Sequence, residues 1–365
     1  MFYVLECPNH DYRRAYQEML DQIEYSESLG FDSVWLAEHH GDDYGSMPSP
    51  QIAAAAIAER TKRLRIGLAV SILPFDNPIR IAEDYAMVDV LSDGRLDFGV
   101  GRGYQPAEFK MLGVQQDISR ELFAEALDVI LGSWTKDPFT YNGKYYSVDN
   151  VSVRPKVVQK PHPPVYVAAI SPETFSLVAK RGLQLLVTPT LMSLEELKTF
   201  ILQAKADLAK LGQDPAKIDF PMNYQMHIAE TVEQAKADTK EALTWYFKRV
   251  MELVPKGPKA PKSYERYAKM AAEFETAGGV SIDALMELGI ILLSDPEGAI
   301  RRIQGLKDDV GQNEIMCWMR IGGLEHQKVM RSMRLFAKEV MPIFKAQEPT
   351  LPTKVAKELN AAAGA

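Results

Sequence analysis

Short apolar segments alternate with longer amphipathic ones along nearly the whole of this 365-residue chain. The apolar segments predict strands, and the amphipathic segments predict helices. Strands that alternate with helices run parallel and are joined by right-handed crossovers, so the chain forms either a doubly wound sheet or a closed barrel. A count of eight strands favours the closed (β/α)8 TIM barrel of the α/β class. We predict these strands at residues 2–6, 33–38, 64–70, 96–101, 165–169, 183–188, 220–229 and 315–323.

Two segments interrupt the alternation. The first, at 139–148, places Asn142-Gly143 between aromatic runs, which predicts a β-hairpin insertion lying across one barrel mouth. The second, at 254–280, is rich in proline and lysine at its start and too long for an ordinary barrel connection, so we expect a long mobile lid loop. We therefore expect a single barrel domain over 1–348 and a tail without function over 349–365.

Composition and charge exclude several classes of partner. The net charge of -7, with no run of Lys or Arg, speaks against nucleic acid and against an anionic membrane surface. No apolar stretch approaches the roughly 18 residues of a membrane span, and the first residues do not have the order of a signal peptide. We expect a cytoplasmic protein with a small-molecule ligand. Cys7 and Cys317 are far apart in the sequence and predict neither a disulfide framework nor a zinc site.

The segment LDFGVGRGYQPAEF, residues 96–109, ends a predicted strand with three alternating glycines around Arg102. Tyr104 stands where a dinucleotide-binding fingerprint needs its third glycine, and no phosphate-binding loop follows. The glycines either let a flat ligand approach the backbone or relieve crowding in a barrel strand. Arg102 is placed at the carboxyl end of the strand, where its guanidinium can bind a phosphate or carboxylate in two parallel hydrogen bonds, or can form a structural ion pair.

A second candidate anion site follows the predicted strand at 165–169. Ser171 and Thr174 flank Pro172, which fits the first turn of a helix, so free backbone amides and two hydroxyls converge there. Taken alone, the motif favours a plain helix cap by Ser171 with Thr174 exposed to solvent. In a barrel, however, Arg102 and Ser171 follow neighbouring strands, so together they can clamp one phosphate.

His39 and His40 follow the predicted strand at 33–38, close to two aspartates. Adjacent strand residues point to opposite faces, so only one of these histidines can face the barrel mouth, and no His-x-His pair is present to hold a metal. We therefore predict no metal site. His39 is a candidate catalytic or ligand-orienting imidazole, although a structural histidine at a strand end is the simpler alternative.

Three segments in order resemble one known family: GFDSVWLAEHH at 30–40, the run from Leu73 to Val114, and PPVYVAAISPETFSLVAKRG at 163–182. The resemblance, which extends from Phe2 to about Phe344, is to the bacterial luciferase-like flavin monooxygenases, and within them to the luciferase α subunit rather than the β subunit. It implies a (β/α)8 barrel that holds FMN at the carboxyl ends of its strands.

Carried over residue by residue, the resemblance implies a catalytic role for His39 and a non-proline cis peptide between Ala69 and Val70 beneath the isoalloxazine. It implies a phosphate clamp of Arg102, Ser171 and Thr174. We add Gly101 and Ile170 to the cofactor site, and we expect Tyr104 and Thr188 to face the substrate. Asn77 and Gly101 depart from the family pattern, and so does the 254–280 segment. The aldehyde specificity and light emission of luciferase therefore do not carry over.

Our first hypothesis is an FMN-dependent monooxygenase that takes reduced FMN from a separate flavin reductase and uses O2 to oxygenate a small organic substrate. The protein would position the reactants and exclude water. We expect a homodimer. Two alternatives stay open: an oxidoreductase of the same fold that uses the deazaflavin F420, and a non-catalytic flavin-binding barrel.

Overall fold

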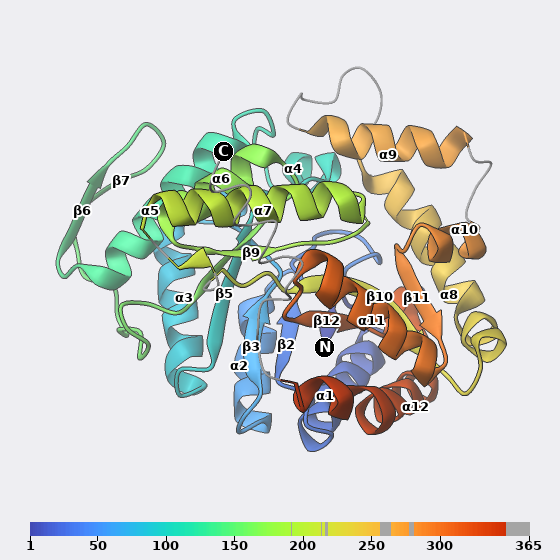
Figure 1. Cartoon of the computed structure of the whole chain (residues 1–365). Coiled ribbons are helices and arrows are strands. Elements are labelled where there is room, and N and C mark those ends of the chain that lie inside the picture. Colours follow the sequence, from blue (N-terminus) through green and yellow to red (C-terminus); the bar gives the residue numbers. More distant parts are fainter. Residues whose placement is uncertain (191, 213, 216–217, 256–263, 277–280, 348–365) are drawn as a thin grey trace.

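The computed structural model describes residues 1–347 except 191, 213, 216–217, 256–263 and 277–280, and it leaves out 348–365 (Figure 1). Within 265–276, the side chains of 270 and 273–276 are also left out. The expected tail at 349–365 and part of the expected lid thus lie outside the described residues. Among the described helices, none is both long and apolar enough to cross a membrane.

Eight parallel strands of the described chain follow one another around a barrel, as the alternation predicts. A single bridge, Val187 to Met222, links the sixth strand to the seventh. The last strand returns to the first where the rings of Phe2 and Trp318 meet edge to face at 4.9 Å. In order, the strands are β1 (Phe2–Tyr3), β2 (Ser33–Leu36), β3 (Arg65–Leu68), β5 (Leu96–Gly101), β8 (Val165–Ala168), β9 (Gln184–Leu186), β10 (Met222–Ile228) and β12 (Ile315–Trp318).

Helices surround these strands (Figure 1). Proline in the first turn and a polar residue before it start several of them: Asn77 accepts from the Ile79 amide, and Asp295 accepts from the Gly298 amide. The surrounding helices are α1 (Tyr12–Ser28), α2 (Pro50–Arg60), α3 (Pro78–Leu91), α5 (Ser119–Thr135), α6 (Pro172–Arg181), α7 (Leu194–Lys210), α8 (Val232–Leu253), α11 (Pro296–Val310), α12 (His326–Leu335) and α13 (Met341–Lys345).

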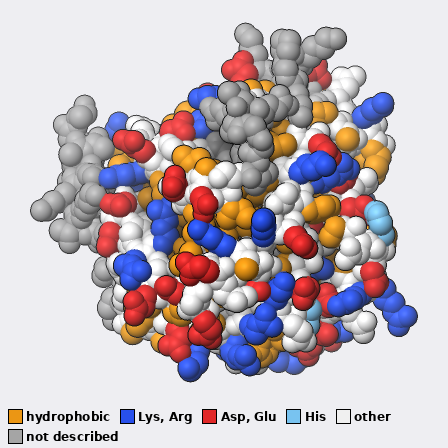
Figure 2. All heavy atoms as spheres, turned by 90° about the vertical axis from the view of Figure 1, so that its right-hand side faces the viewer, with side chains coloured by type: hydrophobic (Ala, Val, Ile, Leu, Met, Phe, Trp, Pro, Cys, Tyr) orange, Lys and Arg blue, Asp and Glu red, His pale blue; other side chains and the backbone are white. Residues whose placement is uncertain are grey.

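The hydrophobic core has two parts. The larger part lies between the strands and the helices, and the smaller part fills the barrel interior around Trp35, Tyr166 and Trp318. On the side that carries α8, acidic and basic side chains are interspersed over the surface, and apolar side chains gather toward the middle (Figure 2).

The region after β10 holds elements that the sequence analysis did not predict. A short helix, α10 (Ile282–Glu287), leads into β11 (Ile291–Ser294) and then α11. β9 pairs with the start of β10, and β11 pairs with its end, on the same edge of β10. β11 is therefore an additional strand outside the eight-strand ring. A short strand, β4 (Ser71–Ile72), similarly continues beside β5 beyond the end of β3.

The expectation of a loop throughout 254–280 is wrong in one respect, because α9 (Glu265–Thr276) occupies its centre. α9 lies above the end of α8 in Figure 1. Tyr264, immediately before α9, is 1% exposed, and Tyr267 is packed against the barrel. A segment that contributes buried aromatic rings can form a helix even though its sequence begins with prolines and lysines.

The segment expected to form a hairpin has two antiparallel strands, β6 (Phe139–Asn142) and β7 (Ser147–Val151). It does not lie across a barrel mouth. The hairpin lies against the outer side of α5 (Figure 1), where the Glu125 carboxylate accepts hydrogen bonds from the backbone amides of Lys144, Tyr145 and Tyr146. This position follows from the turn's free amides, which a carboxylate on a neighbouring helix satisfies.

Candidate active site

A cavity of about 220 Å³ lies at the carboxyl ends of the barrel strands. Its wall is mostly apolar, with a few polar side chains from different strands, which is the usual composition of a small-molecule site. The residues predicted for the site that line it are His39, Ala69, Val70, Gly101, Arg102, Tyr104, Ile170 and Thr188. These predicted residues lie up to about 150 positions apart in the chain, and the fold places them around one cavity.

His39 faces the cavity from just beyond β2 and is 7% exposed. Its Nδ1 lies 2.9 Å from Oε1 of Glu108 and 3.1 Å from the side-chain amide nitrogen of Gln105. Both partners come from the start of α4 (Pro106–Met111), which directly follows the glycine-rich end of β5. With the proton on Nδ1, the ring donates to the carboxylate, and Nε2 is the nitrogen on the opposite side of the ring.

His40 is bound in a different way. Glu108 Oε1 also accepts the His40 amide at 2.9 Å, while the His40 ring lies 3.0 Å from Glu38 Oε1. Burial favours the neutral imidazole, but the hydrogen bond with Glu38 and the negative charges of Glu38 and Glu108 together outweigh it and raise the pKa of His40. Burial likewise raises the pKa of the Glu38 carboxyl. The described lining of the cavity includes Glu38 and His39 but not His40, so only one of the two histidines faces the cavity.

Ala69 and Val70 form the floor of the cavity beyond β3, and the peptide bond between them is cis. Gly101 lies next to this floor: a Cβ added there would stand 2.5 Å from Val70 Cγ2. A Cβ added at Gly99 would stand 1.6 Å from the carbonyl oxygen of Leu68. Of the two interpretations of the glycine run, the structure favours relief of crowding between β3 and β5 at both positions.

Arg102 follows β5 and lines the cavity. Its guanidinium lies over the Tyr264 ring, 4.9 Å from the centroid, and the Tyr264 hydroxyl donates to the Gly103 carbonyl at 3.1 Å. Burial lowers the pKa of Arg102 from its usual value, and nearby Arg120 adds to this effect. Arginine stays charged under any ordinary condition, so the cavity carries a cation at this edge.

Ser171 and Thr174 are placed at the start of α6, immediately after the cavity-lining Ile170, but neither lines the cavity itself. Their hydroxyl oxygens are 3.2 Å apart. The Ser171 hydroxyl and the backbone amide of Glu173 lower the pKa of the exposed Glu173 carboxyl, as does Arg120. Glu173 therefore places a negative charge in the first turn of this helix.

Tyr104 and Thr188, predicted to face the substrate, both line the cavity. The Tyr104 ring stacks on Tyr267 with centroids 4.8 Å apart and planes 5° from parallel. The Tyr104 hydroxyl donates to Tyr44 at 3.2 Å, and Thr188 donates to Thr190 at 3.2 Å. Burial raises the tyrosine pKa values well above 10 at Tyr44 and Tyr104, so both stay protonated hydrogen-bonding groups.

Sequence reasoning missed several residues of this site. Glu108 and Gln105 hold His39, and four tyrosines line or cover the cavity: Tyr44, Tyr246, Tyr264 and Tyr267. Glu108 follows Arg102 closely in the sequence, and this could have indicated that Glu108 belongs to the site. A helix that starts at Pro106 has its first turn near the strand ends. Among the described residues, no group of three or more His, Cys, Asp or Glu side chains is placed to hold a metal ion.

A (β/α)8 barrel with a lined cavity at the carboxyl ends of its strands is the architecture of an enzyme. The family model described as luciferase-like monooxygenase matches residues 2–313. The chain belongs to the luciferase-like monooxygenases, as its three sequence segments indicated.

Two curated relatives align with most of the chain. The alkanal monooxygenase alpha chain of the Kryptophanaron alfredi symbiont is 27% identical, over 93% of this chain and 95% of its own length. The oxygenase component of the flavin-dependent trigonelline monooxygenase of Acinetobacter baylyi is 26% identical, over 91% of each chain.

Solved structures share the fold. The crystal structure of monooxygenase RslO1 from Streptomyces bottropensis has a TM-score of 0.81 at 24% identity, covering 94% of this chain and 99% of that one. The oxygenating constituent of 3,6-diketocamphane monooxygenase from Pseudomonas putida, solved in complex with FMN, has a TM-score of 0.75 at 18% identity, covering 94% and 97%. The coenzyme F420-dependent tetrahydromethanopterin reductase of Methanopyrus kandleri has a TM-score of 0.69 at 20% identity, covering 90% and 96%.

Proposed function

We propose that this enzyme is an FMN-dependent monooxygenase that uses reduced FMN and O2 to oxygenate a small organic substrate. The observation that carries the proposal is the pairing, across one cavity, of the buried imidazole of His39 with the guanidinium of Arg102. The first can hold a proton at the reacting centre, and the second can hold a phosphate. Membership of the luciferase-like monooxygenases and the flavin-dependent relative from Acinetobacter baylyi support the same reaction.

The residues present fit FMN. Its phosphate would bind Arg102 together with Ser171 and Thr174 at the start of α6, where free backbone amides and two hydroxyls can receive an anion. Its flat ring system would lie on Ala69 and Val70, with Gly101 and Ile170 beside it. When bound, reduced FMN would supply the electrons that activate O2.

The chain's own contribution is orientation, proton control and exclusion of water. Glu108 fixes the His39 ring so that Nε2 can donate or accept a proton in the cavity. Tyr104 and Thr188 would contact the substrate from the wall, with the Tyr104 hydroxyl held by Tyr44. The apolar remainder of the lining keeps water away from the reacting atoms.

We also propose two protein partners. A separate flavin reductase would supply the reduced FMN, as the name "oxygenase component" implies for the Acinetobacter relative, and both proteins would work in the cytoplasm. A second copy of the chain would cover the apolar side chains on the neighbouring helices α2 and α3, where Ile52 is 71% exposed and Met87 is 50% exposed, with Val90 and Leu91 beside them. This surface supports a homodimer.

An F420-dependent oxidoreductase is the second candidate function, because F420 also carries a phosphate that the clamp could hold and because an F420-dependent reductase shares the fold. A non-catalytic flavin-binding barrel is a weaker alternative, since it would not need an oriented His39.

Anaerobic titration of the purified protein with FMN, reduced FMN and F420 separates these functions. We expect reduced FMN to bind tightly and, once O2 is admitted, to be reoxidised at a rate different from that of free reduced FMN. Tight F420 binding without reduced FMN binding would overturn the proposal. Flavin binding with the reoxidation rate of free flavin would favour the non-catalytic barrel.

A further inference from the structure

A second cavity, of about 400 Å³, lies at the opposite end of the barrel from the candidate active site. Residues at the amino ends of the strands line it, including Met1, Ser33, Phe220 and Glu314. The remaining wall comes from α7, α11 and the C-terminal helices. No motif in the sequence predicts a cavity there.

Side chains fill the barrel between the two cavities. The rings of Trp35 and Tyr166, both buried, meet edge to face at 5.0 Å inside the barrel. A Cβ added at Gly67 would stand 2.2 Å from the Trp35 ring, so the chain carries glycine where the indole crosses the interior. A ligand in the second cavity is thus separated from the candidate active site by packed aromatic side chains.

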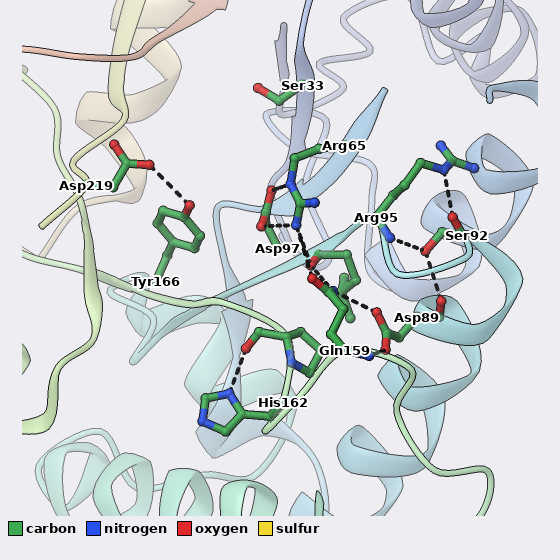
Figure 3. A network of polar contacts seen from close by, with 12 residues as sticks. Ser33, Arg65, Asp89, Ser92, Arg95, Asp97, Gln159, His162, Tyr166 and Asp219 are labelled. Atoms are coloured by element: carbon green, nitrogen blue, oxygen red, sulfur yellow. Dashed lines mark hydrogen bonds and ion pairs between the residues drawn. The ribbon is translucent and has the colours of Figure 1, made fainter. Parts of the chain in front are cut away.

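A polar layer lies at this end of the barrel. Figure 3 shows Arg65 pairing with Asp97 and the Tyr166 hydroxyl donating to Asp219. Glu314 Oε1 accepts from the Ser33 hydroxyl at 2.7 Å and from the Trp35 indole at 3.1 Å. These acidic side chains therefore have partners of their own within the layer.

Lys205, on α7, differs from these acids. It is 2% exposed and lines the second cavity. Its ammonium donates to the Pro215 carbonyl at 3.3 Å and lies 5.5 Å from the centroid of the Phe220 ring. The carboxylates of Asp214 and Asp219 lie near enough to favour its charged form, although the described part of the chain gives it no ion pair with either. Burial lowers the pKa of Lys205 to about 8, so most of the side chain is still charged at pH 7.

A second polar side chain on the cavity wall is Gln312, which is 6% exposed and whose amide nitrogen donates to the Glu314 carbonyl at 2.8 Å. Its Oε1 is buried and has no hydrogen-bond partner among the described residues. This oxygen can accept a hydrogen bond from a donor inside the cavity, and the Lys205 ammonium, with one carbonyl partner, can donate further bonds.

Much of the rest of the wall is apolar, contributed by Phe31, Phe220, Ile303, Phe336, Met341 and Phe344. At the rim, Lys345 pairs with Asp32 at 2.8 Å and Lys307 donates to the neutral side chain of Gln347. The buried Met1 ammonium donates to the Ser33 carbonyl at 2.7 Å. Lys205 is therefore a buried cation that faces a largely apolar part of the wall.

We propose that this cavity is a second ligand site that binds a monocarboxylate with an apolar body, with the carboxylate on Lys205 and the body against the aromatic wall. A volume of a few hundred Å³ suits such a small ligand. An ion pair formed away from water is strong when its partner charge is already buried, because the protein has met the cost of desolvating the lysine during folding. The Gln312 oxygen would accept from a ligand hydroxyl or from a water bound with the ligand.

Calorimetric titration of the full chain with decanoate and with decanol, which has the same chain length without the charge, tests the proposal. We expect decanoate to bind at one saturable site and FMN not to displace it. Lys205→Met should weaken decanoate binding at least tenfold and leave decanol binding within twofold. Lys307→Met, at the rim, is the matched control and should leave both within twofold.

Thermal unfolding of the unliganded variant provides a second readout. Lys205→Met removes a buried charge at nearly constant length, so the unliganded protein should unfold at the same or a higher temperature. Decanoate binding that FMN displaces, or equal decanoate affinity in the wild type and Lys205→Met, would overturn the proposal. A Lys205→Met protein that is destabilised while retaining decanoate affinity would also overturn it, because the lysine would then be structural.

Discussion

Nδ1 of His39 and Oε1 of Glu108 lie 2.9 Å apart, and both side chains are almost completely buried. The same carboxylate oxygen accepts the His40 amide, so one acidic side chain on α4 fixes both the ring of one histidine and the backbone of the next. The loop after β2 and the helix after β5 are held together at the point where the cavity opens.

Removal of the His39 imidazole should separate catalysis from flavin binding. We expect His39→Ala to keep FMN affinity within a few-fold, because the proposed phosphate clamp lies on other strands, while product formation falls by roughly 10²–10⁴. His40→Ala should act mainly on stability and leave turnover nearly intact, since the His40 ring binds Glu38 and does not itself line the cavity. Steady-state kinetics and FMN titration of both variants measure this. Normal turnover in His39→Ala would make the residue structural.

Glu108→Ala should cost about 2–3 kcal/mol of unfolding free energy, because it leaves the His39 ring and the His40 amide without their acceptor in a buried place. It should lower kcat more than it changes KM, because the imidazole loses its orientation. Glu108→Gln keeps an acceptor oxygen and should recover most of the stability. Urea unfolding and kinetics of the two variants give the comparison, and equal stability of the alanine variant and the wild type would contradict it.

The proposed phosphate clamp should depend chiefly on Arg102. Arg102→Ala removes a charged, two-pronged contact and should weaken FMN binding by about 2–4 kcal/mol, whereas Ser171→Ala removes one donor among several and should cost about 1 kcal/mol. Riboflavin, which lacks the phosphate, is the control ligand and should bind both variants nearly as it binds the wild type. A larger loss of FMN affinity in Ser171→Ala than in Arg102→Ala would place the phosphate elsewhere.

Gly101→Ala tests the crowding between β3 and β5. The added methyl would stand 2.5 Å from Val70 Cγ2, so we expect a loss of about 1–3 kcal/mol in unfolding free energy. The double variant Gly101→Ala with Val70→Ala should recover part of this loss, because the second change removes the atom that clashes. Chemical unfolding of the single and double variants measures the coupling. Strictly additive losses would mean that the strand backbone moves instead.

Glu314 should make stability depend on pH. Burial, with Asp219 nearby, raises the pKa of this carboxyl to about 7. The folded protein therefore binds a proton that the unfolded chain has lost between about pH 4.5 and 7, so the stabilisation is complete below about pH 4.5 and is gone once the pH has passed 7. Glu314→Gln should flatten this part of the stability curve, while the exposed Glu287→Gln should not. Urea unfolding midpoints of the wild type and the two variants at pH 5 and pH 7.5 measure this dependence.

The barrel could be predicted because buried parallel strands have apolar runs that stand out from amphipathic helices, as at Leu96–Gly101. β11 could not be predicted in the same way. Its apolar run is short, and its place on the edge of β10 depends on where β9 ends. The helix α9 was hidden by the composition of the residues before it, and Tyr264, which precedes it, finds its partners Arg102 and Gly103 only in the folded barrel.

The residues of the site also divide into those that the sequence could predict and those that it could not. Residues at strand ends were predictable because the barrel brings all strand ends together, which placed His39, Arg102 and Thr188 around one cavity. Glu108 follows no strand, so its contact with His39 depends on the path of α4. The role of Gly101 depended on its contact with Val70, just beyond the end of the neighbouring strand β3, and spacing within one segment does not reveal that contact.

Glu173 places a negative charge in the first turn of α6, beside Ser171 and Thr174. The Ser171 hydroxyl, the backbone amide and Arg120 all lower the pKa of this carboxyl, so it stays ionised near neutral pH. A phosphate bound at this turn would meet that charge, and Arg102 would have to supply more of the attraction. The first turn of α6 would therefore hold a phosphate less firmly than the same turn without an acidic residue, which makes the proposed clamp depend on the arginine.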